Sequence, residues 1–197
     1  MLVACGALSL LSLTSVAQAG AETTTITIDG DGVTPKRVSV SFENAVRWAN
    51  EDSRAHWVAS PEGFFQIGRI SPGDMSERVV AISAGSFDYS TRGRSGDSEG
   101  TVAVPVRVWP GPRSTPTPGA RIRVILSTAW RSDRVYDVQR KRDDGDWITI
   151  ARVTSRIRVI FTPRRTGTFS FRARVELAEG GASGWSPPRK KDVAPPP

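Results

Sequence analysis

Cysteine and histidine are almost missing from this sequence, whose 197 residues include one cysteine, Cys5, and one histidine, His56. A single cysteine excludes an internal disulfide. The common catalytic signatures are missing too. The chain has no Gly-x-Ser-x-Gly elbow, no P-loop, no dinucleotide-binding glycine fingerprint and no carboxylate pair in a glycosidase pattern. We therefore expect a protein that is not an enzyme and that has no cofactor.

Long apolar runs are missing as well, except at the start of the chain. Residues 1–19 carry no charge and end in Ala17-Gln18-Ala19, the small-x-small pattern of a signal-peptidase site. We predict a signal peptide over 1–19, no transmembrane segment, and a secreted or envelope-associated protein without a thiol. No Lys or Arg precedes the apolar stretch, so we expect the true start codon to lie upstream. A lipoprotein anchored through Cys5 is the alternative.

Acidic side chains are scarce in the second half of the chain. Residues 20–105 hold 8 basic and 12 acidic side chains, a net of −4, whereas residues 106–197 hold 19 basic and 8 acidic ones, a net of +11. A strongly basic module attracts anionic polymers and can dock an acidic protein. We expect an anionic envelope polymer or an acidic protein as partner, and no nucleic acid. The alternative is a basic domain that its charge keeps soluble.

Helical periodicity is nearly absent, and alternation of apolar and polar residues recurs along the whole chain. Alternating runs bounded by Gly, Pro, Asn and Asp indicate short strands. Such runs in both halves predict an all-β protein made of two β-sandwiches. The predicted strands are Thr24–Ile28, Arg37–Phe42, Ala45–Trp48, Trp57–Ala59, Arg78–Ile82, Gly85–Ser90, Thr101–Val108, Arg121–Ser127, Val135–Lys141, Trp147–Val153, Arg156–Phe161 and Thr168–Glu176.

A proline-rich stretch separates the two groups of strands. Trp109-Pro-Gly-Pro-Arg-Ser-Thr-Pro-Thr-Pro118 has four prolines in ten residues. Proline stiffens a chain and cannot donate to a ladder. We predict a first domain at 20–108, a semi-rigid Pro-rich linker at 109–117 and a second domain at 118–193. The Pro- and Lys-rich end from Pro187 is expected to be disordered, with 194–197 as a disordered tail.

The first half contains short motifs in a characteristic order. They are Val33-Thr-Pro-Lys-Arg-Val38-Ser-Val40, Ala45-Val-Arg-Trp48-Ala-Asn50, His56-Trp-Val58, Ser71-Pro-Gly-Asp74, Gly85-Ser-Phe-Asp-Tyr89 and Gly100-Thr-Val-Ala-Val104. On these motifs, residues 24–105 resemble a cupredoxin of the plastocyanin type. The resemblance implies a Greek-key β-sandwich that holds one copper ion through two histidines, one cysteine and a weak axial methionine.

Other residues occupy most of the ligand positions of that family. The resemblance places the first histidine at His56, the cysteine at Thr91, the second histidine near Arg94 and the axial methionine near Asp97. A blue-copper site needs a thiolate and two imidazoles, and a guanidinium repels a cation. We therefore predict vestigial ligand positions that hold no copper. Weak binding of Cu(II) or Zn(II) by His56 together with Asp97 or Glu99 is the alternative.

The second half carries motifs of a different kind. They are Val135-Tyr-Asp-Val138, Trp147, Thr168-Phe-Ser-Phe-Arg-Ala-Arg-Val175 and Gly184-Trp-Ser-Pro-Pro188. On these motifs, residues 118–193 resemble a fibronectin type III domain, an immunoglobulin-like sandwich used as a spacer or adhesion module. One departure is the second strand, where Leu126 stands at the usual position of a tryptophan and Trp130 follows four residues later.

Arginines alternate along several strands of the second half, as in Arg121 and Arg123 or Arg156 and Arg158. Alternation puts such side chains on one face of each strand, and strands that share a sheet would form a basic stripe. The plain alternative is a solvated sheet face without a ligand. The candidate polyanion-binding residues are Arg164, Arg165, Arg172, Arg174, Arg189, Lys190 and Lys191.

These observations predict an exported, non-enzymatic binding or structural protein. A degenerate, copper-free cupredoxin domain would precede a basic fibronectin type III module that recognises the envelope or a protein. Two alternatives remain open at this point. One is a copper-binding electron carrier of the cupredoxin family. The other is an accessory subunit of an extracellular hydrolase, because fibronectin modules often accompany such enzymes.

Overall fold

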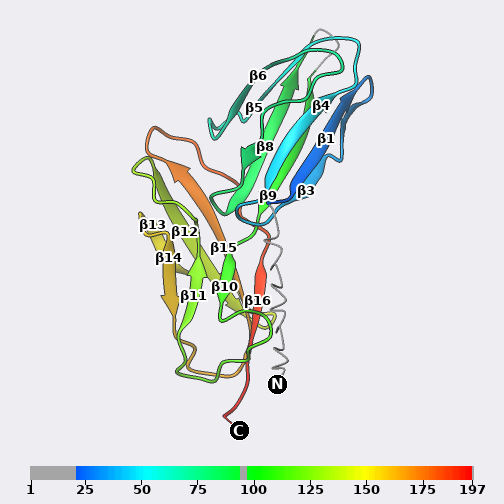
Figure 1. Cartoon of the computed structure of the whole chain (residues 1–197). Helices are drawn as coiled ribbons and strands as arrows, with labels where there is room; N and C mark the ends of the chain where they lie inside the picture. The colour runs from blue at the N-terminus through cyan, green and yellow to red at the C-terminus, as the bar shows by residue number, and fades with distance from the viewer. Residues whose placement is uncertain (1–20, 94–96, 197) are drawn as a thin grey trace, which may run out of the picture.

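The computed structural model describes residues 21–93 and 97–196, so the predicted signal peptide and Cys5 lie outside the described residues. The described chain is all-β, as the alternation predicts, and its strands form four sheets. Figure 1 shows two sheet-rich units, with the first half of the chain in the upper unit and the second half in the lower one. Within the described residues, no helix has the length and apolarity needed to cross a membrane.

The first unit has strands β1 (Thr23–Asp29), β2 (Gly32–Thr34), β3 (Arg37–Ser39), β4 (Ala45–Asn50), β5 (His56–Ala59), β6 (Gln66–Ile70), β7 (Val79–Val80), β8 (Gly85–Arg92) and β9 (Ser98–Val104). They form one sheet of order β2-β1-β4-β7 and another of order β3-β9-β8-β5-β6. The pairs β1–β4 and β3–β9 are parallel. The alternation in β8 places Phe87, Tyr89 and Thr91 inside.

Tryptophan and tyrosine rings fill the centre of this first core. Trp48 is fully buried and meets Tyr89 edge-on, with ring centroids 5.2 Å apart. Tyr89 lies opposite Gly100 in the β8–β9 ladder, and a Cβ at Gly100 would overlap the phenol ring. Only glycine lets the ring cross the neighbouring strand here.

The second unit has strands β10 (Arg107–Trp109), β11 (Ile122–Ile125), β12 (Arg134–Arg142), β13 (Ile148–Thr154), β14 (Arg158–Phe161), β15 (Gly167–Leu177) and β16 (Arg189–Val193). One sheet has the order β10-β11-β14 and the other has the order β13-β12-β15-β16. Asp143 follows β12 in the turn that leads to β13 and has a φ of 51°. Leu126 is fully buried, whereas Trp130 is 65% exposed, so the leucine fills the core at this point.

The predicted linker lies inside the second unit, which corrects the domain boundary. The run expected over Thr101–Val108 is divided, since β9 ends at Val104 and β10 begins at Arg107. Strand β10 pairs with β11, with Trp109 opposite Arg123. The proline-rich stretch therefore connects two strands of one sheet. The prolines do end a strand, as expected, but that strand is β10, which already belongs to the second unit.

The end of the chain is ordered where disorder was expected. Residues Arg189–Val193 form β16, which pairs with β15, and Val193 is 3% exposed. The side chain of Lys191 is also buried and donates hydrogen bonds to the carbonyl oxygens of Gly111, at 2.6 Å, and Ser114. The side chains alternate as in any strand, with Lys191 and Val193 inward and Lys190 and Asp192 outward. The charged composition of this segment made that alternation hard to recognise in the sequence.

The two units are joined by backbone hydrogen bonds along Ile82–Ser86, which we name the junction segment. The N–H of Ala84 donates to the carbonyl of Leu126 at 2.8 Å, and that of Thr128 donates to the carbonyl of Ile82 at 3.0 Å. Ser86 and Gly184 exchange reciprocal backbone hydrogen bonds of 2.9 and 2.8 Å. The apolar cluster of buried residues includes side chains from both units, so the units are packed on one another.

Buried serines complete this junction. The hydroxyl of Ser83 lies 3.1 Å from the hydroxyl of Tyr136, and the hydroxyl of Ser127 donates to the carbonyl of Ile82 at 2.7 Å. Both serines are at most 2% exposed. Ser83 thereby gives the buried hydroxyl of Tyr136 a partner, and the buried hydroxyl of Ser127 finds its own acceptor in the carbonyl of Ile82, which also accepts the N–H of Thr128.

Two adjacent glycines test how tightly the units fit. Gly180 and Gly181 both have positive φ values, 100° and 90°. A Cβ at Gly181 would lie 2.5 Å from the backbone oxygen of Glu62 in the first unit, whereas a Cβ at Gly180 meets nothing within 4 Å. We expect Gly180→Ala to lower the free energy of unfolding by about 1 kcal/mol, from backbone strain. Gly181→Ala should lower the free energy of unfolding by roughly 1–3 kcal/mol more than Gly180→Ala does, because of the clash with Glu62.

Urea unfolding of the two variants provides the measurement. Because Gly180→Ala has the same kind of backbone strain and no clash, the difference between the variants reports the contact between the units. Equal decreases in the free energy of unfolding would show that the two units are not in close contact at Glu62.

Candidate functional site

The predicted copper-ligand positions lie at one end of the first unit. His56 is 3% exposed, and its Nε2 lies 2.8 Å from Oδ2 of Asp52. This hydrogen bond is the main reason why the pKa of Asp52 lies below its usual value. An ionised Asp52 can only accept, so Nε2 of His56 is the donor. The other ring nitrogen, Nδ1, is buried and has no hydrogen-bond partner among residues 21–93 and 97–196.

The other three positions do not complete a copper site around His56. Thr91 is buried, and its hydroxyl oxygen accepts the N–H of Ser98 at 3.3 Å. Asp97 is exposed, and Arg94 lies outside the described residues. A hydroxyl, a carboxylate and a guanidinium supply neither the thiolate nor the second imidazole that blue copper needs. The residues present do not fit that metal. In the described part of the chain, no three His, Cys, Asp or Glu side chains are grouped to hold an ion.

Two of the predicted polyanion-binding arginines are engaged within the fold. Arg172 donates to Oε1 of Gln139 at 3.0 and 2.8 Å, and its guanidinium lies 4.1 Å from the ring centre of Trp147 and 4.8 Å from that of Trp185. Burial lowers the pKa of Arg172. This stacking and hydrogen bonding hold Arg172 on the outer face of the β13-β12-β15-β16 sheet.

Arg174 continues the same arrangement. It donates to Oδ2 of Asp137 at 3.1 and 2.8 Å, lies 2.9 Å from Oε1 of Glu176 and stacks on Trp185 at 5.2 Å. Lys191 is buried and bound to two carbonyls, as described above. We therefore remove Arg172, Arg174 and Lys191 from the candidate site. Arg189 and Lys190 are exposed, and Arg164 and Arg165 are exposed in the loop between β14 and β15.

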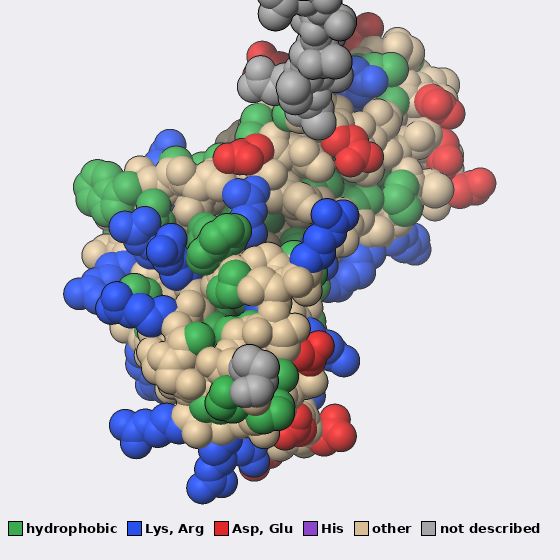
Figure 2. All heavy atoms as spheres, turned by 60° about the horizontal axis from the view of Figure 1, so that its bottom comes forward, with side chains coloured by type: hydrophobic (Ala, Val, Ile, Leu, Met, Phe, Trp, Pro, Cys, Tyr) green, Lys and Arg blue, Asp and Glu red, His purple; other side chains and the backbone are tan. Residues whose placement is uncertain are grey.

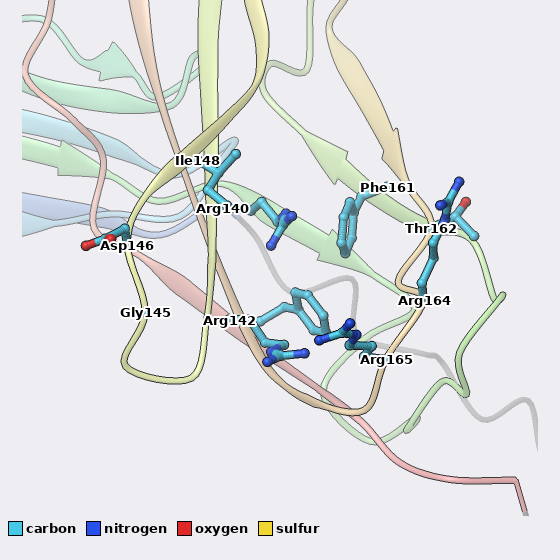
Figure 3. Close-up of a pocket in the computed structure, with 10 residues that line it drawn as sticks. Arg140, Arg142, Gly145, Asp146, Ile148, Phe161, Thr162, Arg164 and Arg165 are labelled. Carbon is cyan, nitrogen blue, oxygen red and sulfur yellow. The ribbon is translucent and has the colours of Figure 1, made fainter.

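Arg164 and Arg165 belong to a pocket that the sequence did not suggest. The pocket has a volume of about 590 Å³ and includes Arg140 and Arg142 of β12 with the rings of Phe161 and Phe169. We name these four arginines and two phenylalanines the arginine pocket. Figure 3 shows Arg140, Arg142 and Arg165 extending into the space between the Gly145 hairpin and Phe161.

The phase of β12 explains why two arginines reach this pocket. Tyr136 and Val138 point into the core, and Arg140 and Arg142 continue the same side of the strand. The inward-facing side chains of β12 are therefore apolar or aromatic at its start, and arginines at its end. The guanidinium of Arg140 lies 5.3 Å from the ring centre of Phe161 and 5.9 Å from that of Phe169, over the last aromatic rings of the core.

The charges in the arginine pocket are not balanced. Arg142 lies 3.4 Å from Oδ2 of Asp143, and Asp146 lines the pocket. Against these two carboxylates stand four guanidinium groups, and Nε of Arg140 is buried with no hydrogen-bond partner. A buried guanidinium N–H without an acceptor is unusual in a folded protein. The pocket thus presents unmatched donors and positive charge.

A second basic surface covers the outer side of the β10-β11-β14 sheet. Trp109, Arg123 and Ile160 lie side by side across the three strands, with Arg121 and Arg158 next to them. Trp109 is 54% exposed and Ile160 is 49% exposed. The predicted basic stripe is therefore present only on β11 and β14, which share a sheet. The arginines of β15 do not extend it, because β15 belongs to the other sheet. In Figure 2, Lys and Arg side chains predominate on the second unit.

Comparisons with known proteins give a distant likeness among solved structures. No protein-family model matches the chain. No curated protein matches it either. Among solved structures, the chain is similar to a mutant of amicyanin, a cupredoxin, in its Cu(I) form. The identity is 19%, the match covers 43% of this chain and 82% of that one, and the TM-score is 0.36. A likeness of this degree says nothing about which metal or partner the chain binds.

The buried ammonium of Lys191 should contribute to stability. Lys191→Met keeps the length of the side chain but removes its hydrogen bonds to Gly111 and Ser114. We expect the free energy of unfolding to fall by about 1–3 kcal/mol. The exposed neighbour provides a control, and Lys190→Met should change it by at most about 0.5 kcal/mol. Equal stability of the two variants in urea unfolding would place Lys191 on the surface.

Asp137 should make the protein sensitive to acid. Burial works to raise its pKa, but hydrogen bonds from the N–H of Val153 and from Arg174 outweigh burial and bring the pKa below 3.8. A lowered carboxyl pKa contributes stability that is complete above the unfolded value, near 3.8, and is lost as the pH falls through the folded value.

Thermal unfolding between pH 7 and pH 2 checks this expectation. Asp137→Asn should be less stable than the wild type at pH 7, and the gap should narrow below about pH 4 because only the wild type still has a carboxylate to protonate. Asp133→Asn, at a half-exposed position, is the control and should track the wild type. A gap that stays constant down to pH 2 would contradict the lowered pKa.

Proposed function

We propose that this protein is an exported, non-enzymatic binding protein whose second unit recognises anionic groups of an envelope polymer. The arginine pocket is the observation that carries the proposal. Four arginines line one hollow, the side chains of Arg140, Arg142 and Arg165 extend into it (Figure 3), and the buried Nε of Arg140 has no hydrogen-bond partner among the described residues. Export rests on the signal-peptide pattern of residues 1–19.

The chemistry of the arginine pocket favours phosphate or carboxylate groups on a larger molecule. Guanidinium groups bind planar or tetrahedral oxyanions through paired hydrogen bonds. Phe161 and Phe169 lie beneath Arg140, and the partly buried ring of Phe161 adds apolar surface for the uncharged part of a repeating unit, whereas Phe169 is buried. Two exposed arginines, Arg164 and Arg165, stand at the pocket in a loop between strands.

The net charge of the second half supports recognition of a polymer. Residues 106–197 carry a net of +11, from 19 basic and 8 acidic side chains. A positive field of this size raises the local concentration of a polyanion and speeds its encounter. Arg121, Arg123 and Arg158 on the outer sheet face extend the positive surface beyond the pocket. A long anionic chain could therefore contact both surfaces.

Binding of a fluorescent polyphosphate across a salt series tests the proposal. Arg164→Gln combined with Arg165→Gln should weaken binding about tenfold at low salt, since each exposed ion pair contributes roughly 0.5–1 kcal/mol. The affinity of the double variant should also fall less steeply with salt, because fewer charges are engaged.

The control is Arg131→Gln combined with Arg156→Gln, which removes the same charge from exposed positions outside the pocket. It should weaken binding by less than about threefold. Equal losses in the two double variants would show attraction by net charge alone. No binding by the wild type, either to polyphosphate or to polyglutamate, would refute polyanion recognition and would leave an acidic protein as the partner.

A further inference from the structure

A second hollow lies in the first unit, beside the junction with the second. It occupies about 110 Å³ between the two sheets of the first unit. We name it the apolar crevice. All of its lining side chains are apolar except those of Ser83 and Arg134. Its walls include Val46 of β4, Phe87 of β8 and Val102 of β9.

The apolar crevice reaches the surface of the protein. Val80 lines it and is 46% exposed, and Phe64, Phe65 and Val79 line it and are partly buried. A small molecule can therefore enter without separation of the two sheets. Ligand pockets occur preferentially at the contact between two structural units, which is where this crevice lies.

Arg134 brings a positive charge from the second unit to the crevice. Its side chain is only 13% exposed, and its Nη1 donates to the hydroxyl of Ser83 at 3.0 Å. Its Nε is buried and has no hydrogen-bond partner in the part of the chain that the structure describes. The nearest carboxylate is Oδ2 of Asp133 at 3.9 Å from Nε, too far for a hydrogen bond. Asp133 is half-exposed and also lies 3.4 Å from Arg131.

An apolar hollow beside a guanidinium whose buried Nε has no hydrogen-bond partner in the described residues suits one class of ligand. The hollow excludes water in favour of hydrocarbon, while Arg134 offers the donor geometry that carboxylates accept. We propose that the apolar crevice binds a small apolar monocarboxylate, with the carboxylate on Arg134 and the hydrocarbon between the sheets. This inference is independent of polyanion recognition, since it uses none of the residues of the arginine pocket.

The volume sets the size of the hydrocarbon. An engineered cavity of about 150 Å³ in another protein accepts benzene. A hollow of about 110 Å³ therefore accepts a chain of roughly four to six carbons or most of one ring. Longer chains would have to extend into solvent along Val80.

A titration with a series of fatty acids tests the proposal. We would follow backbone amide shifts of the isotope-labelled protein while adding butanoate, hexanoate, octanoate or hexanamide. Affinity should rise about fourfold per methylene from butanoate to hexanoate, as expected for buried CH₂ groups. It should rise much less from hexanoate to octanoate. Hexanamide should bind at least about tenfold more weakly than hexanoate, because it has no charge for Arg134.

Two variants separate the carboxylate site from the hollow. Arg134→Met removes the charge and keeps an apolar stem, and Ser83 retains Tyr136 as a hydrogen-bond partner. It should abolish the preference for hexanoate over hexanamide. Ala81→Leu fills the crevice from a position that is 8% exposed, and it should weaken both ligands. Arg131→Met, at an exposed neighbour, should leave hexanoate binding unchanged.

Three results would overturn the proposal. One is the absence of amide shifts near Ala81 and Ala84 at saturating hexanoate, which would make the crevice a packing gap. Another is an unchanged preference for hexanoate in Arg134→Met. The third is equal weakening by Arg131→Met, which would show attraction by net charge. Polyphosphate binding by the same samples should be unaffected by hexanoate, so failure of one site is distinguishable from failure of the other.

Discussion

In the junction segment, Ile82–Ser86, the backbone groups of Ile82, Ala84 and Ser86 form hydrogen bonds with the other unit. Ala84 is fully buried and Ser83 is 2% exposed, so separation of the units would leave their donors and acceptors without partners or expose apolar surface. The reciprocal hydrogen bonds between Ser86 and Gly184 hold the beginning of β8 against the second unit. The junction thereby places Arg134 beside a hollow of the first unit. Opposite net charges of the two halves are not needed to explain this docking, because the contacts are made by backbone and serine groups.

Arginine, the most abundant charged residue, has several structural roles in the second unit. Arg172 and Arg174 lie on the outer face of one sheet, where tryptophan rings and acceptor side chains hold them. Arg140 and Arg142 point inward, at the open end of the sandwich, over phenylalanine rings. Arg121, Arg123 and Arg158 face solvent on the other sheet. Composition counts these residues alike, but the structure leaves guanidinium groups for a ligand in the arginine pocket, on the solvent-facing sheet and, through Arg134, at the apolar crevice.

Much of the fold could be predicted from the sequence, because strand alternation is a local signal. Each predicted run contains a strand, and the all-β class follows from the same pattern. The boundary at 109–117 was wrong because proline content is a local property, whereas the membership of β10 depends on its pairing with β11. The disorder expected from Pro187 was wrong for a similar reason. Lys191 looks like a solvated charge in sequence, yet two carbonyls of the β10–β11 connection receive its ammonium.

The candidate site shows where prediction from sequence ends. Arg164 and Arg165 stood out as a basic pair, while Arg140 and Arg142 did not, since the acidic turn that follows them balances their charge in sequence. The period of two that relates Arg140 and Arg142 to Val138 could have shown that they face inward. It could not have shown which loop lies opposite them. The sequence by itself determined most of the strands, though not β2, β6 or β16, together with the faces of the predicted strands and the side-chain donors at the His56 end, because these depend on residue identity and on the period of two. Only the tertiary structure decided which arginines meet acceptors, which meet aromatic rings and which remain unmatched, because those partners come from strands far apart in the chain.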